Sequence, residues 1–529
     1  MARQVAAPAF PASPVDVVRA AAVGVALLLA VFVVWPVIAL LVHGLLTPVA
    51  SWPWRIAMQT LAVALSSAFV AVGLAVLLAF VITRMDIPGR AMLWQLFTIG
   101  ALIPPFMAPL ALLVLFGALA SGASRLGLTT IVAGQALAFL PYAVALIVRV
   151  LARIPAELEQ AAEVLGASRW TIMRRVTVGL AGPGLLRAAL VLVGLCLADV
   201  ATPLLLGGDS RVLSTMIVDA AAVDGHGGAA ALLLAALATL AALPAGAWRF
   251  AGAVARDQPA LPRLERPTPA TLRWVLGLAA WGIALVPAAL WVVVPLGSLL
   301  RVGVGTRGLS FEHWAVLAGA AGIGALRNSL LLGLGVALAG TALALVTAWT
   351  IEGSAGSWGR AIALLAWVPI VIPGVAAGVG YVLVFGMPPV MLATMPILIA
   401  IVACWELPVT SRVARDVLVR TDRSIEDAAV SLGADRATTL TRIVAPSLRP
   451  VAGWLFGYLF AAGVMAVGTV IAVTGPGREL GALTMLTLAA AGATGAACAV
   501  ATALLALAGG AVLLGRAIAG RQRGPTLLA

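Results

Sequence analysis

The sequence predicts an all-α, polytopic membrane protein with about 12 transmembrane helices arranged as two six-helix repeats. Three features support this fold class: the composition, the lengths of the apolar segments, and a pattern that occurs twice. Hydrophobic residues make up 63% of the 529 residues and charged residues only 10%, whereas soluble proteins carry about 25% charged residues. The composition therefore excludes a soluble enzyme and a disordered scaffold, and the long apolar segments favour helices over a β-barrel.

Twelve apolar segments are long enough for a helix to cross the bilayer core, which takes about 20 residues. The first six are predicted near residues 18–42, 56–82, 91–118, 129–149, 182–206 and 228–249. The second six are predicted near residues 272–300, 327–351, 361–386, 393–413, 450–474 and 488–515. The first segment exceeds the roughly 7–15 residues of a signal-peptide core, so we expect an uncleaved helix there.

A polar, proline-rich segment, ARDQPALPRLERPTPAT, separates the two sets and is predicted to be a cytoplasmic linker. The predicted domains are therefore the first repeat at residues 1–254 (helices 1–6), the linker at residues 255–271, and the second repeat at residues 272–529 (helices 7–12).

The basic residues predict the orientation. The chain has no lysine, and all 33 basic residues are arginines. With the N-terminus inside, 26 arginines fall on or beside cytoplasmic segments and 7 on external ones, as the positive-inside rule requires. We therefore expect both termini to be cytoplasmic, and the positive charge calls for no nucleic-acid partner. The absence of lysine excludes a P-loop nucleotide site in this chain.

The cysteines and histidines have no metal-ligand spacing. They are Cys196, Cys404, Cys498, His43, His226 and His313, scattered singly along the chain. We interpret the cysteines as buried packing residues and predict no metal and no cofactor in this chain.

The pattern that occurs twice lies in the largest predicted cytoplasmic loop of each half. Residues 151–178 read LARIPAELEQAAEVLGASRWTIMRRVTV, and residues 418–445 read LVRTDRSIEDAAVSLGADRATTLTRIVA, an offset of 267 residues. Pro155 can open a short helix, and Gly166 and Gly433 can end one with positive φ. Because loops usually diverge faster than the elements they connect, a loop kept in two copies indicates a docking surface.

These loops resemble the EAA motif of binding-protein-dependent ABC importer permeases, in which Gly follows E-A-A after three residues. The first copy is Gln160-Ala161-Ala162 with Gly166, and the second is Asp427-Ala428-Ala429 with Gly433. Both copies depart from the motif at its Glu, where Gln160 and Asp427 stand. Glu159 and Glu426, one position earlier, are therefore alternative acidic contacts. The first copy also has Val178-Gly179 where the motif has Leu-Pro.

The resemblance implies a fused permease of the type I ABC importer fold, without enzymatic activity of its own, in a bacterial inner membrane. Its implied partners are two copies of an ABC ATPase, which bind the ATP, and a periplasmic or lipid-anchored substrate-binding protein. Each loop would form the helix that couples to one ATPase. Fused permeases of this length are typical of the iron(III), thiamine and putrescine/phosphonate group. Residues 197–217 resemble the iron(III) branch, which makes iron(III) the expected cargo and the others its alternatives.

Asp199 and Glu406 are the acids that the prediction places inside spans, and their counterparts at the 267-residue offset are Ala466 and Phe139. Acids in a membrane are costly and usually functional, so both are candidate residues of the transport pathway. The alternative is an acid that reaches the membrane interface from a helix end.

Prolines should interrupt the third helix of each half, beside the pathway. They are Pro104, Pro105, Pro369 and Pro373.

Two other classes of membrane protein fit the sequence less well. An ion-coupled secondary transporter would need coupling acids near mid-membrane and a repeat strongest in the spans. A membrane enzyme would need a paired-carboxylate metal motif, which is not visible in the sequence.

Overall fold

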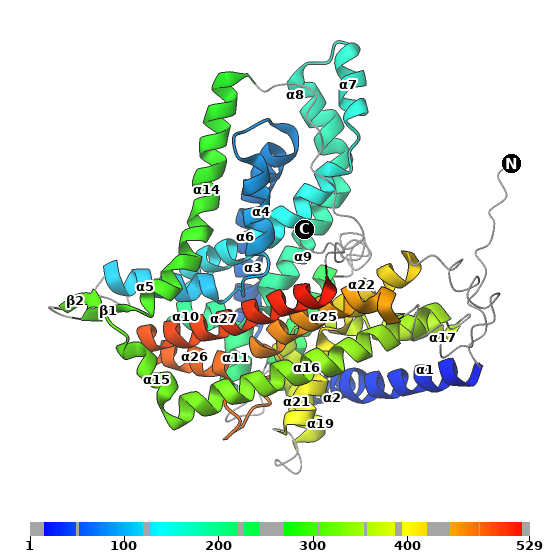
Figure 1. The fold of residues 1–529 in the computed structure, drawn as a ribbon, viewed down its shortest axis with the longest axis vertical. Coiled ribbons are helices and arrows are strands. Elements are labelled where there is room, and N and C mark those ends of the chain that lie inside the picture. The colour runs from blue at the N-terminus through cyan, green and yellow to red at the C-terminus, as the bar shows by residue number, and fades with distance from the viewer. Residues whose placement is uncertain are drawn as a thin grey trace.

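The computed structural model describes residues 15–48, 52–119, 126–220, 227–242, 269–303, 306–353, 357–386, 394–420, 445–475 and 477–520. These residues are almost entirely helical (Figure 1). The predicted helical class is confirmed, with one exception. Strands β1 (Leu300–Gly303) and β2 (Thr306–Leu309) form an antiparallel hairpin in which Leu300 pairs with Leu309.

The helices of the first half are α1 (Val15–Leu29), η1 (Ala30–Val34), α2 (Trp35–Leu46), α3 (Trp54–Arg84), α4 (Arg90–Gly100), α5 (Met107–Leu119), α6 (Leu128–Ala152), α7 (Ala156–Val164), α8 (Arg169–Thr171), η4 (Ile172–Thr177), α9 (Val178–Ala198), α10 (Ala201–Leu206), α11 (Leu213–Ala220) and α12 (Gly227–Ala242). Both η1 and η4 are π-helical turns, each continuous with the helix that follows it.

The helices of the second half are α14 (Ala270–Gly297), η5 (Glu312–Trp314), α15 (Ala315–Ala318), α16 (Ala320–Gly353), α17 (Ser357–Leu365), α18 (Val368–Val371), α19 (Gly374–Phe385), α21 (Met395–Trp405), α22 (Leu407–Arg420), α25 (Ala445–Val464), α26 (Gly481–Ala490) and α27 (Thr494–Ala519). Helices α5, α6, α9 and α12 begin 267 residues before α19, α21, α25 and α27, which is the offset of the two sequence loops.

Seven described helices are long and apolar enough to cross a membrane, or nine if each of two bent pairs counts as one span. Four shorter apolar helices accompany them. The chain is thus a multi-pass membrane protein by helix length and composition, and the number 12 stays a prediction.

Several predicted spans are not continuous helices. The third helix of each half is broken where the prolines predicted a break, between α4 and α5 and, with a bend of 110°, between α18 and α19. The predicted span 182–206 ends early, at Ala198, and 393–413 bends by 59° at Glu406. Pro203 and Pro408 follow these breaks, and a proline lacks the N–H that would bond four residues back. The predicted span 450–474 ends at Val464.

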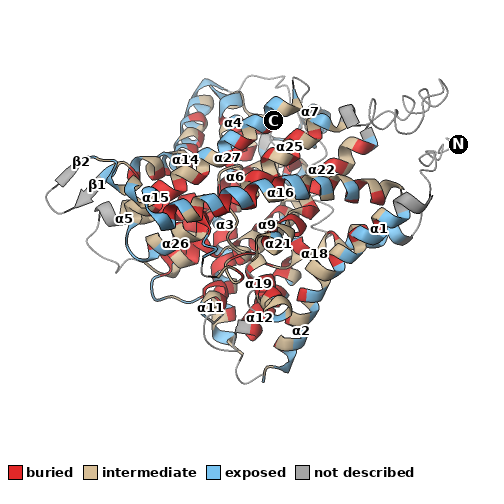
Figure 2. Ribbon diagram, turned by 60° about the horizontal axis from the view of Figure 1, so that its bottom comes forward, coloured by how far each residue is buried: buried red, intermediate tan, exposed pale blue. Residues whose placement is uncertain are grey.

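The N-terminal helix of each half packs against the other half. Helix α1 lies along α16 and α2 packs on α19, while α14 stands beside α3, α4 and α5 (Figure 1). The Tyr381 hydroxyl on α19 donates to the Phe32 carbonyl at 2.6 Å, and the Trp281 indole on α14 donates to the Pro88 carbonyl at 3.1 Å. The buried residues form two large clusters, each built from both halves. Figure 2 shows that buried residues are concentrated in the middle of the molecule.

Candidate functional site

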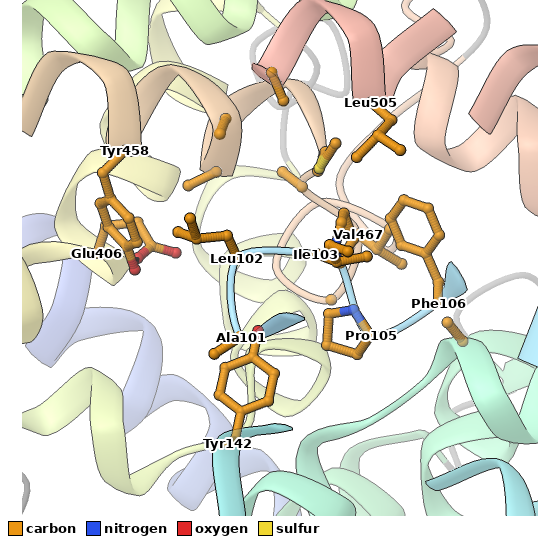
Figure 3. A pocket seen from close by; sticks show the side chains of 18 of the residues that line it. Ala101, Leu102, Ile103, Pro105, Phe106, Tyr142, Glu406, Tyr458, Val467 and Leu505 are labelled. Carbon is orange, nitrogen blue, oxygen red and sulfur yellow. Dashed lines mark hydrogen bonds between the residues drawn. The ribbon is translucent and has the colours of Figure 1, made fainter. Parts of the chain in front are cut away.

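A cavity of about 720 Å³ lies between the two halves (Figure 3). Its wall includes the turn between α4 and α5, the break between α9 and α10, the bend between α21 and α22, and parts of α6, α25 and α27. Most of the lining is apolar, as ligand cavities commonly are. The polar exceptions include Asp199, Glu406, Tyr142 and Tyr458, so the structure brings the two predicted pathway acids to one cavity.

The cavity is lined by matched positions of the two halves. Six pairs separated by 267 residues both contribute to the wall: Phe139 and Glu406, Leu195 and Ala462, Ala198 and Met465, Asp199 and Ala466, Val200 and Val467, and Ala201 and Gly468. The backbone framework of the wall is therefore similar on its two sides. Its charge is not, because in each acidic pair the matched residue is apolar.

Asp199 is held at the helix break by hydrogen bonds. Its Oδ1 accepts the Thr202 backbone N–H at 3.2 Å, and its Oδ2 accepts the Gln135 amide at 3.2 Å. Gln135 in turn donates to the Cys196 carbonyl at 2.9 Å and accepts the Ser67 hydroxyl at 2.9 Å. The carboxylate thus stabilises the junction of α3, α6, α9 and α10, where Pro203 prevents a continuous helix.

Glu406 accepts fewer hydrogen bonds than Asp199. One carboxylate oxygen, Oε2, accepts the Tyr458 hydroxyl of α25 at 2.8 Å, and the Tyr458 ring stacks on Trp454 with centroids 5.3 Å apart. Figure 3 shows the Glu406 carboxylate and the Tyr142 hydroxyl both directed into the cavity. The sequence alone does not identify Tyr142 and Tyr458 as cavity residues, because a tyrosine in an apolar segment can equally be an anchor at the membrane interface.

The first of the two repeated loops contains the short helix that its sequence predicts, α7, and from Arg169 the chain continues through α8 and η4 into α9. Helix α7 ends in a Schellman motif: Ala167 N–H bonds the Ala162 carbonyl at 3.0 Å, and Gly166 N–H bonds the Glu163 carbonyl at 2.9 Å. The φ of Gly166 is +82°, which confirms the predicted left-handed conformation. Space around its Cα is open, so only the backbone conformation favours glycine here.

Glu159 has an internal role that the sequence analysis did not foresee. Its Oε1 accepts Arg84 Nε of α3 at 3.0 Å and the Thr177 hydroxyl of η4 at 2.8 Å. Arg84 also donates to the carbonyls of Leu151 and Ile154. These bonds tie α7 to the C-terminal ends of α3 and α6. Arg84 lies 75 residues from Glu159 in sequence, and no local pattern predicts such a pair.

The outer side of this loop is apolar and open. Val164 and Leu165 are 86% and 87% exposed, and Leu158 and Trp170 are also exposed. Ala161 is exposed and Ala162 and Gln160 are partly buried. Large exposed apolar side chains beyond the ends of the spans indicate a surface that another protein covers.

The matching residues of the second loop lie outside the described residues. They are Glu426, Asp427, Ala428, Ala429 and Gly433. Most of the predicted linker, residues 255–268, also lies outside them. Within the described ranges, no group of three or more His, Cys, Asp or Glu side chains could hold a metal ion.

Residues 71–245 match the family of the binding-protein-dependent transport system inner membrane component. This segment includes α7, Gly166 and Asp199.

Three curated relatives are each 26% identical to the chain. The probable ABC transporter permease protein y4fN of Sinorhizobium fredii aligns over 57% of this chain and 57% of its own length. The ferric transport system permease protein FbpB of Actinobacillus pleuropneumoniae aligns over 66% and 52%. A Haemophilus influenzae protein, whose name carries the same ferric transport designation, aligns over 66% and 56%. The alignments therefore span little more than half of these relatives, which are transport permeases rather than enzymes.

Proposed function

We propose that this chain is the transmembrane permease of an ATP-driven, binding-protein-dependent ABC importer, with both halves of the pathway in one chain. The observation that carries the proposal is the family match over residues 71–245, a segment that holds both the exposed α7 loop and one acid of the cavity. The recurrence of helix starts at 267 residues supports two related halves. The cavity between them supports a pathway along their junction.

The α7 loop is the proposed docking element for an ATPase. Its exposed side chains, Leu158, Val164, Leu165 and Trp170, supply the apolar contact, and the turn at Gly166 sets the angle between α7 and the helix that begins at Arg169. Glu159 is engaged by Arg84 and Thr177, so we propose that it fixes the loop to the spans rather than contacting the ATPase. We propose that the ATPase is contacted by Gln160, Ala161 and Ala162 in the first loop, and by the residues from Glu426 to Gly433 in the second loop.

For the cargo we propose ferric iron, supported by the names of two of the similar permeases. Thiamine, putrescine or a phosphonate remain the alternatives within the same mechanism. A soluble or lipid-anchored binding protein would deliver the cargo from outside. The chain would lie in the bacterial inner membrane with both termini in the cytoplasm.

The stoichiometry of the purified complex tests this function. The chain is co-expressed with candidate ABC ATPase subunits from the same organism and purified, and the mass of the complex is measured by native mass spectrometry. We expect one copy of this chain with two copies of the ATPase, because two loops imply two docking sites. A chain that purifies without any ATPase, from cells that express both, would contradict the proposal.

Topology is tested separately with an impermeant maleimide. The native cysteines are buried, so new ones at Glu312 and Ser168, both exposed, report their own side of the membrane. We expect Glu312→Cys to be labelled in intact cells and Ser168→Cys only after lysis. Labelling of both in intact cells would contradict the orientation.

A further inference from the structure

We propose that Glu406, Tyr458 and Tyr142 form a subsite that binds the positive charge of a cationic cargo on its way through the cavity. The inference rests on the proposed function and adds to it the charge of the cargo and the residues that contact it.

The first step of the argument is the charge balance of the cavity. Asp199 and Glu406 both line it, and neither forms an ion pair with any residue in the described part of the chain. Arg516 also reaches the cavity, but it is exposed and bonds neither acid there. A partly buried carboxylate without a counter-charge is unfavourable. A cation in the cavity offsets that cost, whereas an anion increases it.

The second step is the different state of the two acids. Both oxygens of Asp199 already accept hydrogen bonds, from Thr202 and Gln135. Glu406 uses one oxygen for Tyr458, and its Oε1 has no hydrogen-bond partner among the described residues. The Tyr142 hydroxyl, directed toward the same space in Figure 3, makes no hydrogen bond to them either. Glu406 is therefore the acid available to a cargo, and Asp199 serves the framework.

The third step is the chemistry of the donors. Glu406 offers a carboxylate oxygen, and Tyr142 and Tyr458 offer hydroxyl oxygens and aromatic faces. Carboxylate oxygen suits hard metal cations, while aromatic faces also attract ammonium groups. The subsite thus selects for positive charge, which fits ferric iron, thiamine and putrescine. It disfavours a phosphonate, whose negative charge would face Glu406.

The test separates the charge of Glu406 from its hydrogen bond. Glu406→Gln keeps an oxygen that accepts the Tyr458 hydroxyl but removes the charge, whereas Tyr458→Phe removes the bond and keeps the charge. Each variant is reconstituted in liposomes with the ATPase and the binding protein. Uptake is measured with radiolabelled ferric iron, thiamine and putrescine in turn, and with a radiolabelled phosphonate.

We expect E406Q to lower uptake of the transported cation about 10- to 100-fold, since a bond to a charged group contributes about 1.5–3 kcal/mol. E406D should restore part of the rate, and Y458F should lower it less than E406Q does. Assembly with the ATPase should be unchanged in all three. Uptake of one of the three cations, and not of the other two, identifies the cationic cargo.

Three outcomes would overturn the subsite. One is wild-type uptake in E406Q combined with loss in Y458F, which would mean that the pair only connects the bend between α21 and α22 to α25. Another is equal loss in E406Q and E406D. The third is uptake of the phosphonate in preference to the cations. If instead the wild-type complex shows no ATP-dependent uptake of any of these, the proposed function fails, and the subsite with it.

Discussion

The two halves of this chain share a helical framework but not its chemistry. Four helices of the first half begin 267 residues before four helices of the second half, and matched positions of the two halves line the same cavity. Yet the position matched to Asp199 at this offset is Ala466, and the position matched to Glu406 is Phe139. The ion pairs at the C-terminal ends of α3 and α16 differ as well: Arg84 of α3 pairs with Glu159 of the α7 loop, whereas Glu352 of α16 pairs with Arg415 of α22.

This difference separates two kinds of polar residue in a membrane protein. Polar groups with several partners, such as Asp199 and Glu159, hold helix breaks and loops in place. A polar group with one partner beside a cavity, such as Glu406, can bind something else. Substitutions at a residue of one half and at the matched position of the other half therefore distinguish residues that hold the helical framework from residues that bind cargo in the cavity.

The largest effect is expected at the loop glycines. Gly166→Leu forces a side chain into a left-handed conformation that costs roughly 1–2 kcal/mol and changes the angle at which the ATPase would dock. Combined with Gly433→Leu it should abolish uptake. Either single variant shows how much each half contributes. Uptake in reconstituted liposomes is the measurement.

Gly182→Leu is the matched control for this variant. Its Cα also faces open space, and its φ is not left-handed, so we expect uptake near the wild-type level. Equal loss at Gly182 and Gly166 would show that bulk, and not backbone conformation or docking, explains the effect.

A smaller effect, on thermal stability, is expected when the acid at Asp199 is removed or an acid is placed at the matched position, Ala466. Asp199→Ala leaves the Gln135 amide and the Thr202 N–H without their acceptor, at about 1–3 kcal/mol for each buried group. Asp199→Asn keeps one acceptor and should cost less. Ala466→Asp should also destabilise, because Val402 occupies the position matched to Gln135. Thermal unfolding followed by size-exclusion chromatography ranks the three, and an Asp199→Ala protein as stable as wild type would refute the framework role.

The smallest effect is expected from the pair at the loop. In a double-mutant cycle, Arg84→Gln and Glu159→Gln should show a coupling energy of about 1 kcal/mol, since the pair is only partly exposed. The same cycle on Arg415 and Glu352 is the comparison in the second half. We expect only the first cycle to change ATPase co-purification, because that pair holds the α7 loop, which is the proposed docking element. A coupling energy of zero in the first cycle would leave the loop held by other contacts.

Much of this fold follows from local rules in the sequence. The lengths of the apolar segments predicted the long helices, and the prolines at 104, 105, 369 and 373 predicted the broken third helices. Gly166 predicted the end of α7. The breaks before Pro203 and Pro408 obey the same rule, but the apolar character continues through them and conceals them.

Other features depend on tertiary contact and could not be predicted. Hydropathy does not predict that α1 packs on α16 or that α14 packs on α3, because all of these helices are apolar. The Arg84–Glu159 and Tyr458–Glu406 pairs join residues 75 and 52 positions apart. The acids themselves were found because charge within a span is rare. Their partners were not, because tyrosine and glutamine in a span carry no such signal.

The central claim is that ATP on a separate subunit drives transport through this chain. The most direct measurement is uptake of the cargo into liposomes that contain the chain, with the ATPase, the binding protein and ATP added one at a time. The account predicts uptake only when all three are present, and the same rate after a protonophore collapses the pH gradient. Uptake by this chain alone that follows the pH gradient and ignores ATP would contradict it.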